Sequence, residues 1–212
     1  MKKQLLLIAI LFAGTAFSQI SQNITLLSNW FNPATPAEPT YAIKYNGIWG
    51  WVDPQDNKEY AIIGSTEGVY FIDVSIPTAP VVRDYVPGRR TNCIWREIKT
   101  YQNYCYMVSD DGAPNSLQIV DMSYLPDSVS VKHDNNTIIE RCHTIFVDGN
   151  KLYAGIPKGP SVSGYSYMAV YSLANPILPT LLRTIEQDDP SPEACHDMFV
   201  RNDTVYASCG ND

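Results

Sequence analysis

The chain has 212 residues, of which 45% are hydrophobic, and its 22 acidic residues outnumber 15 basic ones to give a net charge of −7. An acidic surface repels phosphate backbones, and no basic cluster is larger than the pair Arg89 and Arg90, so we expect no nucleic-acid partner. The five cysteines contain no CxxC pair and no dense framework, which argues against a small disulfide-dense scaffold.

Residues 1–18 read as a signal peptide. Lys2 and Lys3 precede an apolar stretch from Leu5 to Phe17, and small residues follow toward Ser18. The stretch is shorter than the roughly 20 residues that a bilayer span needs, so it predicts a removed export signal rather than a transmembrane segment. We expect cleavage before Gln19 and a secreted or cell-surface protein.

Residues 19–47 are expected to form an outer closing strand followed by a connector. The segment 23–30 resembles the fourth strand of the later units, and a proline-rich run follows at 32–39. An outer strand at the start of a repeat array normally completes the last repeat and hides an exposed sheet edge.

From Ile48 onward one pattern recurs about every fifty residues. The candidate equivalent residues Trp49, Trp95, His143 and His196 lie 46, 48 and 53 residues apart. The pattern divides the chain into blade 1 at 48–88, blade 2 at 93–135, blade 3 at 141–187 and the start of blade 4 at 194–212. The predicted strands are 48–52, 60–64, 69–74 and 80–85; then 94–98, 104–108, 117–122 and 128–131; then 142–147, 152–155, 168–173 and 180–185; and last 195–200 and 205–208.

Four strands in about fifty residues, rich in Val, Ile and Tyr, match one blade of a β-propeller. We therefore predict an all-β, propeller-like array of four-stranded blades, an incomplete arc of about three and a half blades. A β-sandwich also gives short strands at regular spacing, but it does not predict the fifty-residue repeat. The fourth unit holds two strands only, so we expect the N-terminal piece of a longer protein.

The repeats resemble those of the choice-of-anchor B family, exported bacterial proteins built from LVIVD repeats. The resemblance rests on the segments 69–74 (VYFIDV), 117–122 (LQIVDM), 45–53 (YNGIWGWVD) and 95–99 (WREIK). It implies a propeller-like domain, export and, in full-length relatives, a C-terminal sorting or anchoring segment downstream. It implies no catalytic residues, and Ser172 departs from the pattern where the other units have Asp.

Four aromatic and imidazole side chains are the candidate ligand residues, because first strands lie nearest the axis of a propeller and share one channel mouth. They are Trp49, Trp95, His143 and His196. Only two are histidines, whereas a zinc site needs three or four ligands. Cys142 and Cys195 precede the histidines, but neighbours on a strand point to opposite faces. We expect no metal site there.

The acidic residues have a structural interpretation. Asp73 and Asp121 each end a third strand, where a carboxylate can accept N–H groups of the following turn. The loops 110–112 and 188–193 are weak candidates for calcium, but neither has the spacing of an EF-hand loop. Solvated surface loops are the better interpretation, and we expect no other cofactor.

One disulfide is the best candidate among the five cysteines. A tight turn at 202–203 places Cys195 opposite Gly210 and makes Cys195 and Cys209 diagonal neighbours, so a bridge between them needs a bulge or twist. Buried free thiols are the alternative.

The sequence contains no Gly-x-Ser-x-Gly elbow and no glycine-rich phosphate loop, which argues against an enzyme. The leading hypothesis is a non-catalytic binding scaffold whose partner is an unknown protein or glycan. The first alternative is a glycan-active or other hydrolase or lyase at the channel mouth, in which Glu97 and Asp197 act as acid and base. The second is a structural or adhesive surface module.

Overall fold

The computed structural model describes residues 23–210, so the predicted signal peptide, its cleavage site before Gln19 and the last two residues lie outside the described residues. The described chain is all-β, with short 3-10 helices at Pro160–Val162 and Ile185–Gln187 as its only helical elements. No helix within residues 23–210 has the length and apolarity to cross a bilayer.

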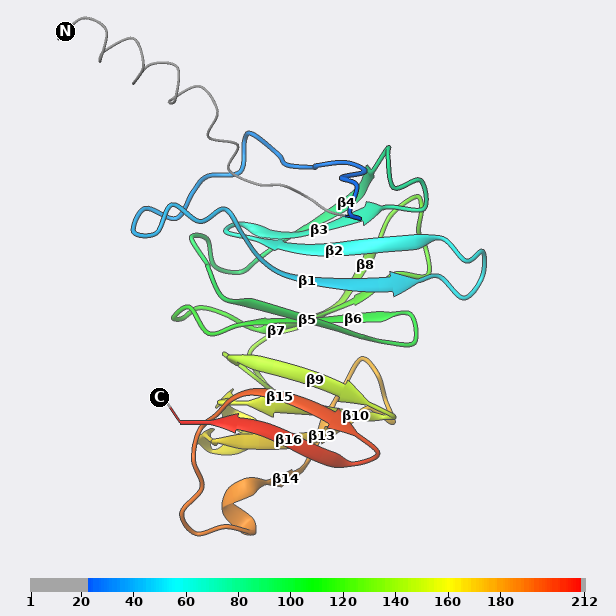
Figure 1. Ribbon diagram of the computed structural model, residues 1–212. Coiled ribbons are helices and arrows are strands. Elements are labelled where there is room, and N and C mark those ends of the chain that lie inside the picture. The colour runs from blue at the N-terminus through cyan, green and yellow to red at the C-terminus, as the bar shows by residue number, and fades with distance from the viewer. Residues whose placement is uncertain (1–22, 211–212) are drawn as a thin grey trace, which may run out of the picture.

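Three consecutive segments form three four-stranded antiparallel sheets (Figure 1). The first sheet contains β1 (Tyr45–Val52), β2 (Glu59–Ser65), β3 (Gly68–Asp73) and β4 (Val81–Pro87). The second contains β5 (Arg96–Tyr101), β6 (Tyr104–Ser109), β7 (Leu117–Asp121) and β8 (Ser130–Asn135). The third contains β9 (Thr144–Asp148), β10 (Lys151–Gly155), β13 (Met168–Ser172) and β14 (Thr180–Thr184).

Two smaller strand pairs complete the described chain. A small pair, β11 (Lys158–Gly159) and β12 (Gly164–Tyr165), is inserted between β10 and β13 of the third sheet. The chain then forms a hairpin of β15 (Cys195–Arg201) and β16 (Thr204–Cys209). The expected all-β array of four-stranded units is confirmed.

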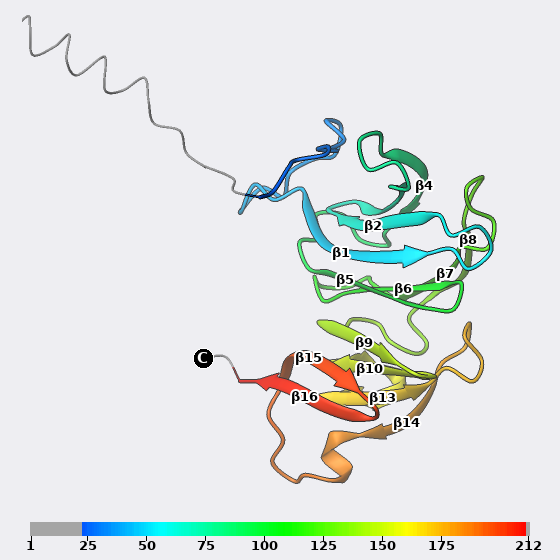
Figure 2. The same cartoon turned by 45° about the vertical axis from the view of Figure 1, so that its right-hand side comes forward.

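The sheets stack face to face, and their first strands β1, β5, β9 and β15 follow one another along one side of the molecule (Figures 1 and 2). Ile62 and Phe71 of the first sheet pack against Met107 of the second. Tyr106 of the second packs in one cluster with Leu152 of the third. The second sheet is therefore covered on both faces by its neighbours, and residues 30–35 cover part of the outer face of the first sheet. All residues of β3 and of β7 are buried as a result, and their sequences are almost continuously apolar.

Side-chain caps end the third strands, as predicted. Asp73 accepts the N–H of Ser75 at 3.1 Å and Asp121 accepts that of Ser123 at 3.0 Å. In the third sheet Ser172 takes the same role, because its Oγ accepts the N–H of Ala174 at 3.2 Å. Serine at this position therefore preserves the turn.

The predicted strand at 94–98 begins later than expected, at Arg96. The N–H groups of Ile94 and Trp95 donate to Oδ2 of Asp111, each at 2.9 Å, instead of to a neighbouring strand. A carboxylate thus replaces the first pairs of the ladder and holds Trp95 outside the sheet.

The segment 23–30 forms no strand within the described residues. It packs on the outer face of the first sheet through side chains, since the Trp30 ring meets the rings of Tyr45 and Tyr70 at 5.9 and 5.1 Å. Ser28 Oγ also donates to the carbonyl of Pro77 at 2.7 Å. The role of this segment in closing a further sheet stays a prediction.

Candidate functional site

The first strands begin around one small pocket with a volume of about 200 Å³. We call it the first-strand pocket. It is lined by Asn46 of β1, by Trp95, Arg96 and Glu97 at the start of β5, by His143 and Thr144 at the start of β9, and by His196 and Asp197 of β15. Residues far apart in the sequence therefore share one site because four strands start at the same end of the stack.

Three of the four predicted ligand residues lie in this pocket, and Trp49 does not. Its indole Nε1 donates to Thr100 Oγ1 at 3.0 Å, and Lys99 Nζ lies 4.4 Å from its ring centroid. Trp49 therefore packs on the second sheet, and its expected equivalence with Trp95 is corrected.

Strand pairing explains the error. Trp51 pairs with Tyr60, which pairs with Asp73, whereas Tyr101 pairs with Tyr104, which pairs with Asp121. Trp51 and Tyr101 are therefore equivalent positions. Counting back two residues from each shows that Trp49 is equivalent to Lys99. The longer loop between β1 and β2 displaces the alignment that the sequence motif suggests.

His143 is held by a carboxylate that the sequence did not assign to this site. Its Nδ1 donates to Oδ2 of Asp110 at 2.6 Å, and Asp110 comes from the loop after β6. This hydrogen bond raises the pKa of the imidazole above its usual 6.5, while partial burial opposes the shift and Asp197 and Glu97 reinforce it. The signal in the sequence is the Asp-Asp pair at 110–111, a pattern that by itself favours a solvated surface loop.

The two histidines form a pair. Their ring centroids are 4.5 Å apart with an interplanar angle of 52°. His143 is partly buried and His196 is exposed, so the His196 ring packs on the His143 ring at the surface of the pocket. Nε2 of His143 has no hydrogen-bond partner among residues 23–210 and remains available to a ligand.

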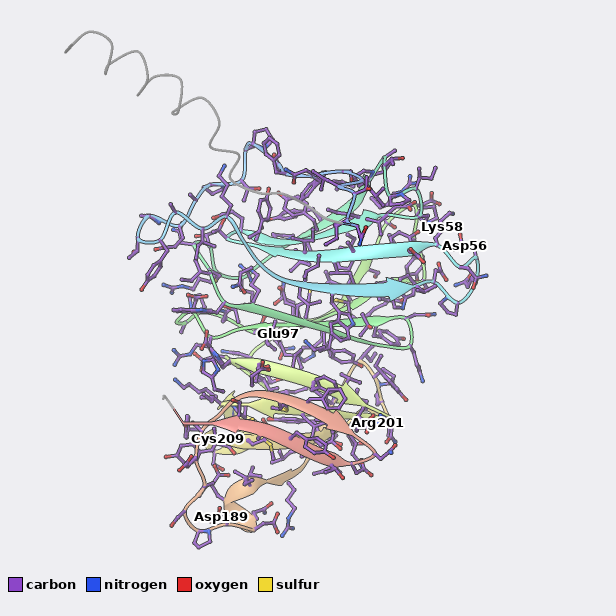
Figure 3. The ribbon with its side chains drawn as sticks, viewed as in Figure 1. Asp56, Lys58, Glu97, Asp189, Arg201 and Cys209 are labelled. Carbon is purple, nitrogen blue, oxygen red and sulfur yellow. The ribbon has the colours of Figure 1, made fainter. Side chains whose placement is uncertain are left out.

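The charged groups of the pocket differ in how they are paired within the protein. Glu97 forms an ion pair with Lys99 and lies on β5 facing the third sheet (Figure 3). Asp197 Oδ1 accepts the N–H of Met198 at 2.7 Å and lies 3.5 Å from Thr144 Oγ1. The guanidinium of Arg96 is buried and donates to the main-chain carbonyls of Ser65, Thr66 and Arg90 at 2.6 to 3.4 Å, and no carboxylate within residues 23–210 forms an ion pair with it.

Trp95 is the large apolar side chain of the pocket and is 46% exposed. Asp111 fixes its main chain by accepting the N–H groups of Ile94 and Trp95. The next residue, Arg96, is anchored to the first sheet by its guanidinium. An exposed indole on a fixed backbone is a surface prepared for contact, because no conformational freedom of the backbone is lost on binding.

A β-bulge at His196 changes the predicted pairing of the hairpin. Cys195 pairs with Cys209 and Asp197 with Ser208, so His196 is the extra residue of β15. The expected pairing of Cys195 with Gly210 is therefore corrected, and the two cysteines are direct neighbours rather than diagonal ones. Both are free thiols in the structure.

The two loops weighed for calcium use their carboxylates within the protein. Asp110 and Asp111 hold His143 and the start of β5, and Asp188 forms an ion pair with Arg183 at 2.6 Å. Within the described part of the chain, no three His, Cys, Asp or Glu side chains cluster as they would around a metal ion.

No family model and no curated protein matches the sequence. The resemblance to LVIVD-repeat proteins thus stays an expectation.

Proposed function

We propose that this protein is an exported β-propeller-type binding module that holds a carbohydrate in the first-strand pocket without cleaving it. The observation that carries the proposal is the combination of a half-exposed indole, Trp95, with two imidazoles and two carboxylates at the common start of the first strands. Export is inferred from the predicted signal peptide, and the propeller from the stacked four-stranded units with adjacent first strands.

Ion pairing within the protein favours a neutral ligand over an ionic one at two of the lining residues. Glu97 is paired with Lys99, and His143 with Asp110. The carbonyl groups around the buried Arg96 satisfy its N–H donors without neutralising its charge, and the Asp197 carboxylate carries the opposite charge in the same pocket. The same side chains still offer donors and acceptors to hydroxyl groups, and the Trp95 ring offers an apolar surface with a polar N–H edge.

The pocket volume limits the ligand to a small unit. Pockets for drug-sized ligands measure about 300–1,000 Å³, whereas this pocket holds about 200 Å³. We infer that it takes one sugar ring, with the rest of a longer glycan extending over the surface.

A hydrolase remains the second candidate, because the Asp110–His143 pair is the arrangement that orients an imidazole for proton transfer. The only hydroxyl-bearing lining residue is Thr144, which is buried and lies beside Asp197 rather than His143. The geometry therefore supplies a candidate base without a nucleophile paired to it.

Binding of the full chain to a panel of bacterial and plant saccharides tests both candidates. Trp95→Ala should weaken the best interaction by at least about tenfold, as expected for a central aromatic contact. Tyr41→Ala is the matched control, since Tyr41 is 62% exposed and lies outside the pocket.

Saccharide products should not accumulate during the same incubations. Turnover that disappears in a folded His143→Ala variant would establish the hydrolase instead. Equal affinity of the Trp95→Ala and Tyr41→Ala variants, or no binding by the parent chain, would contradict the carbohydrate proposal.

A further inference from the structure

Cys195 and Cys209 are direct partners across the last hairpin. The N–H of Gly210 donates to the carbonyl of Ala194 at 3.3 Å, while the N–H of Cys195 donates away from the hairpin to Tyr167. The cysteines thus form a non-hydrogen-bonded pair, the antiparallel position in which Cα atoms approach to about 4.5 Å and side chains are closest. That separation lies within the range of about 4.4–6.8 Å that disulfides span.

The β-bulge at His196 brings Cys195 directly opposite Cys209. Without His196 as an extra residue, Cys209 would face His196 and the two sulfurs would point to opposite sides of the ribbon. The bulge residue is also the histidine that stacks on His143. One irregularity therefore aligns the two sulfurs and places an imidazole in the first-strand pocket.

We propose that Cys195 and Cys209 form a cross-strand disulfide that fixes the bulge holding His196 in the first-strand pocket. The proposal rests on the export part of the proposed function, because a structural disulfide needs an oxidising compartment. It does not depend on the identity of the ligand.

The accessible thiol reacts first. Cys209 is exposed and Cys195 is buried (Cys209 lies at the free end of β16 in Figure 3). The Cys209 thiolate attacks a disulfide of the oxidant, a thiol–disulfide oxidoreductase or oxidised glutathione, and releases one of its sulfurs as a thiolate. The Cys195 thiolate then attacks Sγ of Cys209, which forms the new S–S bond and releases the second sulfur of the oxidant. The oxidant is thus reduced to two thiols, which carry the protons that the cysteines lose.

The second step should be the slower one. Burial raises the pKa of the Cys195 thiol to about 12, and the adjacent Cys209 adds to the shift. Few thiolates are therefore present at neutral pH. We expect bond formation to accelerate as the pH of the oxidation buffer is raised from 7 to 9.

Peptide mapping tests the bond. After incubation of the full chain with oxidised glutathione, alkylation and trypsin digestion, we expect the peptides 184–201 and 202–212 to be linked. Cys93→Ser is the matched control and should retain the linked pair, whereas Cys209→Ser should lose it. Recovery of Cys209 as an alkylated thiol, or linked to another cysteine, would overturn the proposal.

Hydrogen exchange tests the effect on the bulge without any ligand. Oxidation should slow amide exchange in β15 and β16 and raise the melting temperature by several degrees. If the two cysteines are linked but amide exchange in β15 and β16 is unchanged, the disulfide does not fix the bulge and the proposal is overturned. Because neither readout involves a saccharide, failure here is distinguishable from failure of the binding proposal.

Discussion

His143 is the residue on which the chemistry of the pocket depends most. Its Nδ1 is occupied by Asp110 at 2.6 Å, and the hydrogen bond keeps the pKa of the imidazole above 6.5. A group whose pKa is raised on folding stabilises the folded state while it is protonated in both states. This contribution is present below pH 6.5 and is lost as the pH rises through the higher folded value.

Asp110→Asn should therefore lower the pKa of His143, because the largest cause of its elevation is removed. The free energy of unfolding should fall by about 1–2 kcal/mol at pH 5, and the deficit should shrink above pH 7. NMR titration of the imidazole and denaturation at several pH values measure both effects.

Asp188→Asn is the control for this substitution, since Asp188 pairs with Arg183 in an exposed loop. It should leave the titration of His143 unchanged. A His143 midpoint that does not move in Asp110→Asn would show that the hydrogen bond has no part in the shift.

Sequence reasoning identified His143, His196 and Trp95 but could not find Asp110 or exclude Trp49. Asp110 approaches His143 only because the loop after β6 meets the start of β9 from the neighbouring sheet. Such a contact has no periodicity along the chain. Trp49 was assigned by a repeated motif, and motif similarity did not reveal the shift in strand pairing.

At the scale of the elements, close packing between the third sheet and the hairpin positions the pocket. A Cβ atom on Gly155 of β10 would collide with the main-chain carbonyl of Cys195 and with Thr144 Cγ2 at 2.6 Å. Glycine at this position lets β15 approach β10 closely. The approach brings the start of β15 beside that of β9.

Gly155→Ala should consequently destabilise the protein by about 1–3 kcal/mol, the usual cost of overpacking, and should weaken ligand binding. Gly50→Ala is the control, because a Cβ there meets nothing within 4 Å. Chemical denaturation of both variants measures the difference. Equal stability of the two would contradict the close packing of β10 and β15.

Strand positions were predicted well where both faces are buried, as in β3 and β7, because burial requires continuous apolar residues. Predictions were poorer where side chains replace main-chain pairing. Asp111 delays the start of β5, and the bulge in β15 shifts the register of the last hairpin. Neither device leaves a hydrophobic pattern in the sequence.

At the scale of the whole molecule, the stack of sheets explains why one pocket collects residues separated by about 150 positions. Each sheet contributes the start of its first strand, and burial between sheets fixes their order. The fifty-residue repeat predicts the four-stranded units that follow one another along the chain. The outer faces remain less covered, since Ile48 of β1 is 67% exposed and Tyr206 of β16 is 63% exposed.

The central claim is that the first-strand pocket binds a carbohydrate and leaves it intact. NMR spectra of the isotope-labelled full chain, titrated with the best saccharide of the panel, test this claim most directly. We expect saturable shifts of the Trp95 indole and of the His143 and His196 imidazoles, with no new reducing-end signals from the saccharide. Shifts confined to the exposed outer face around Ile48, or the appearance of cleaved saccharide, would contradict it.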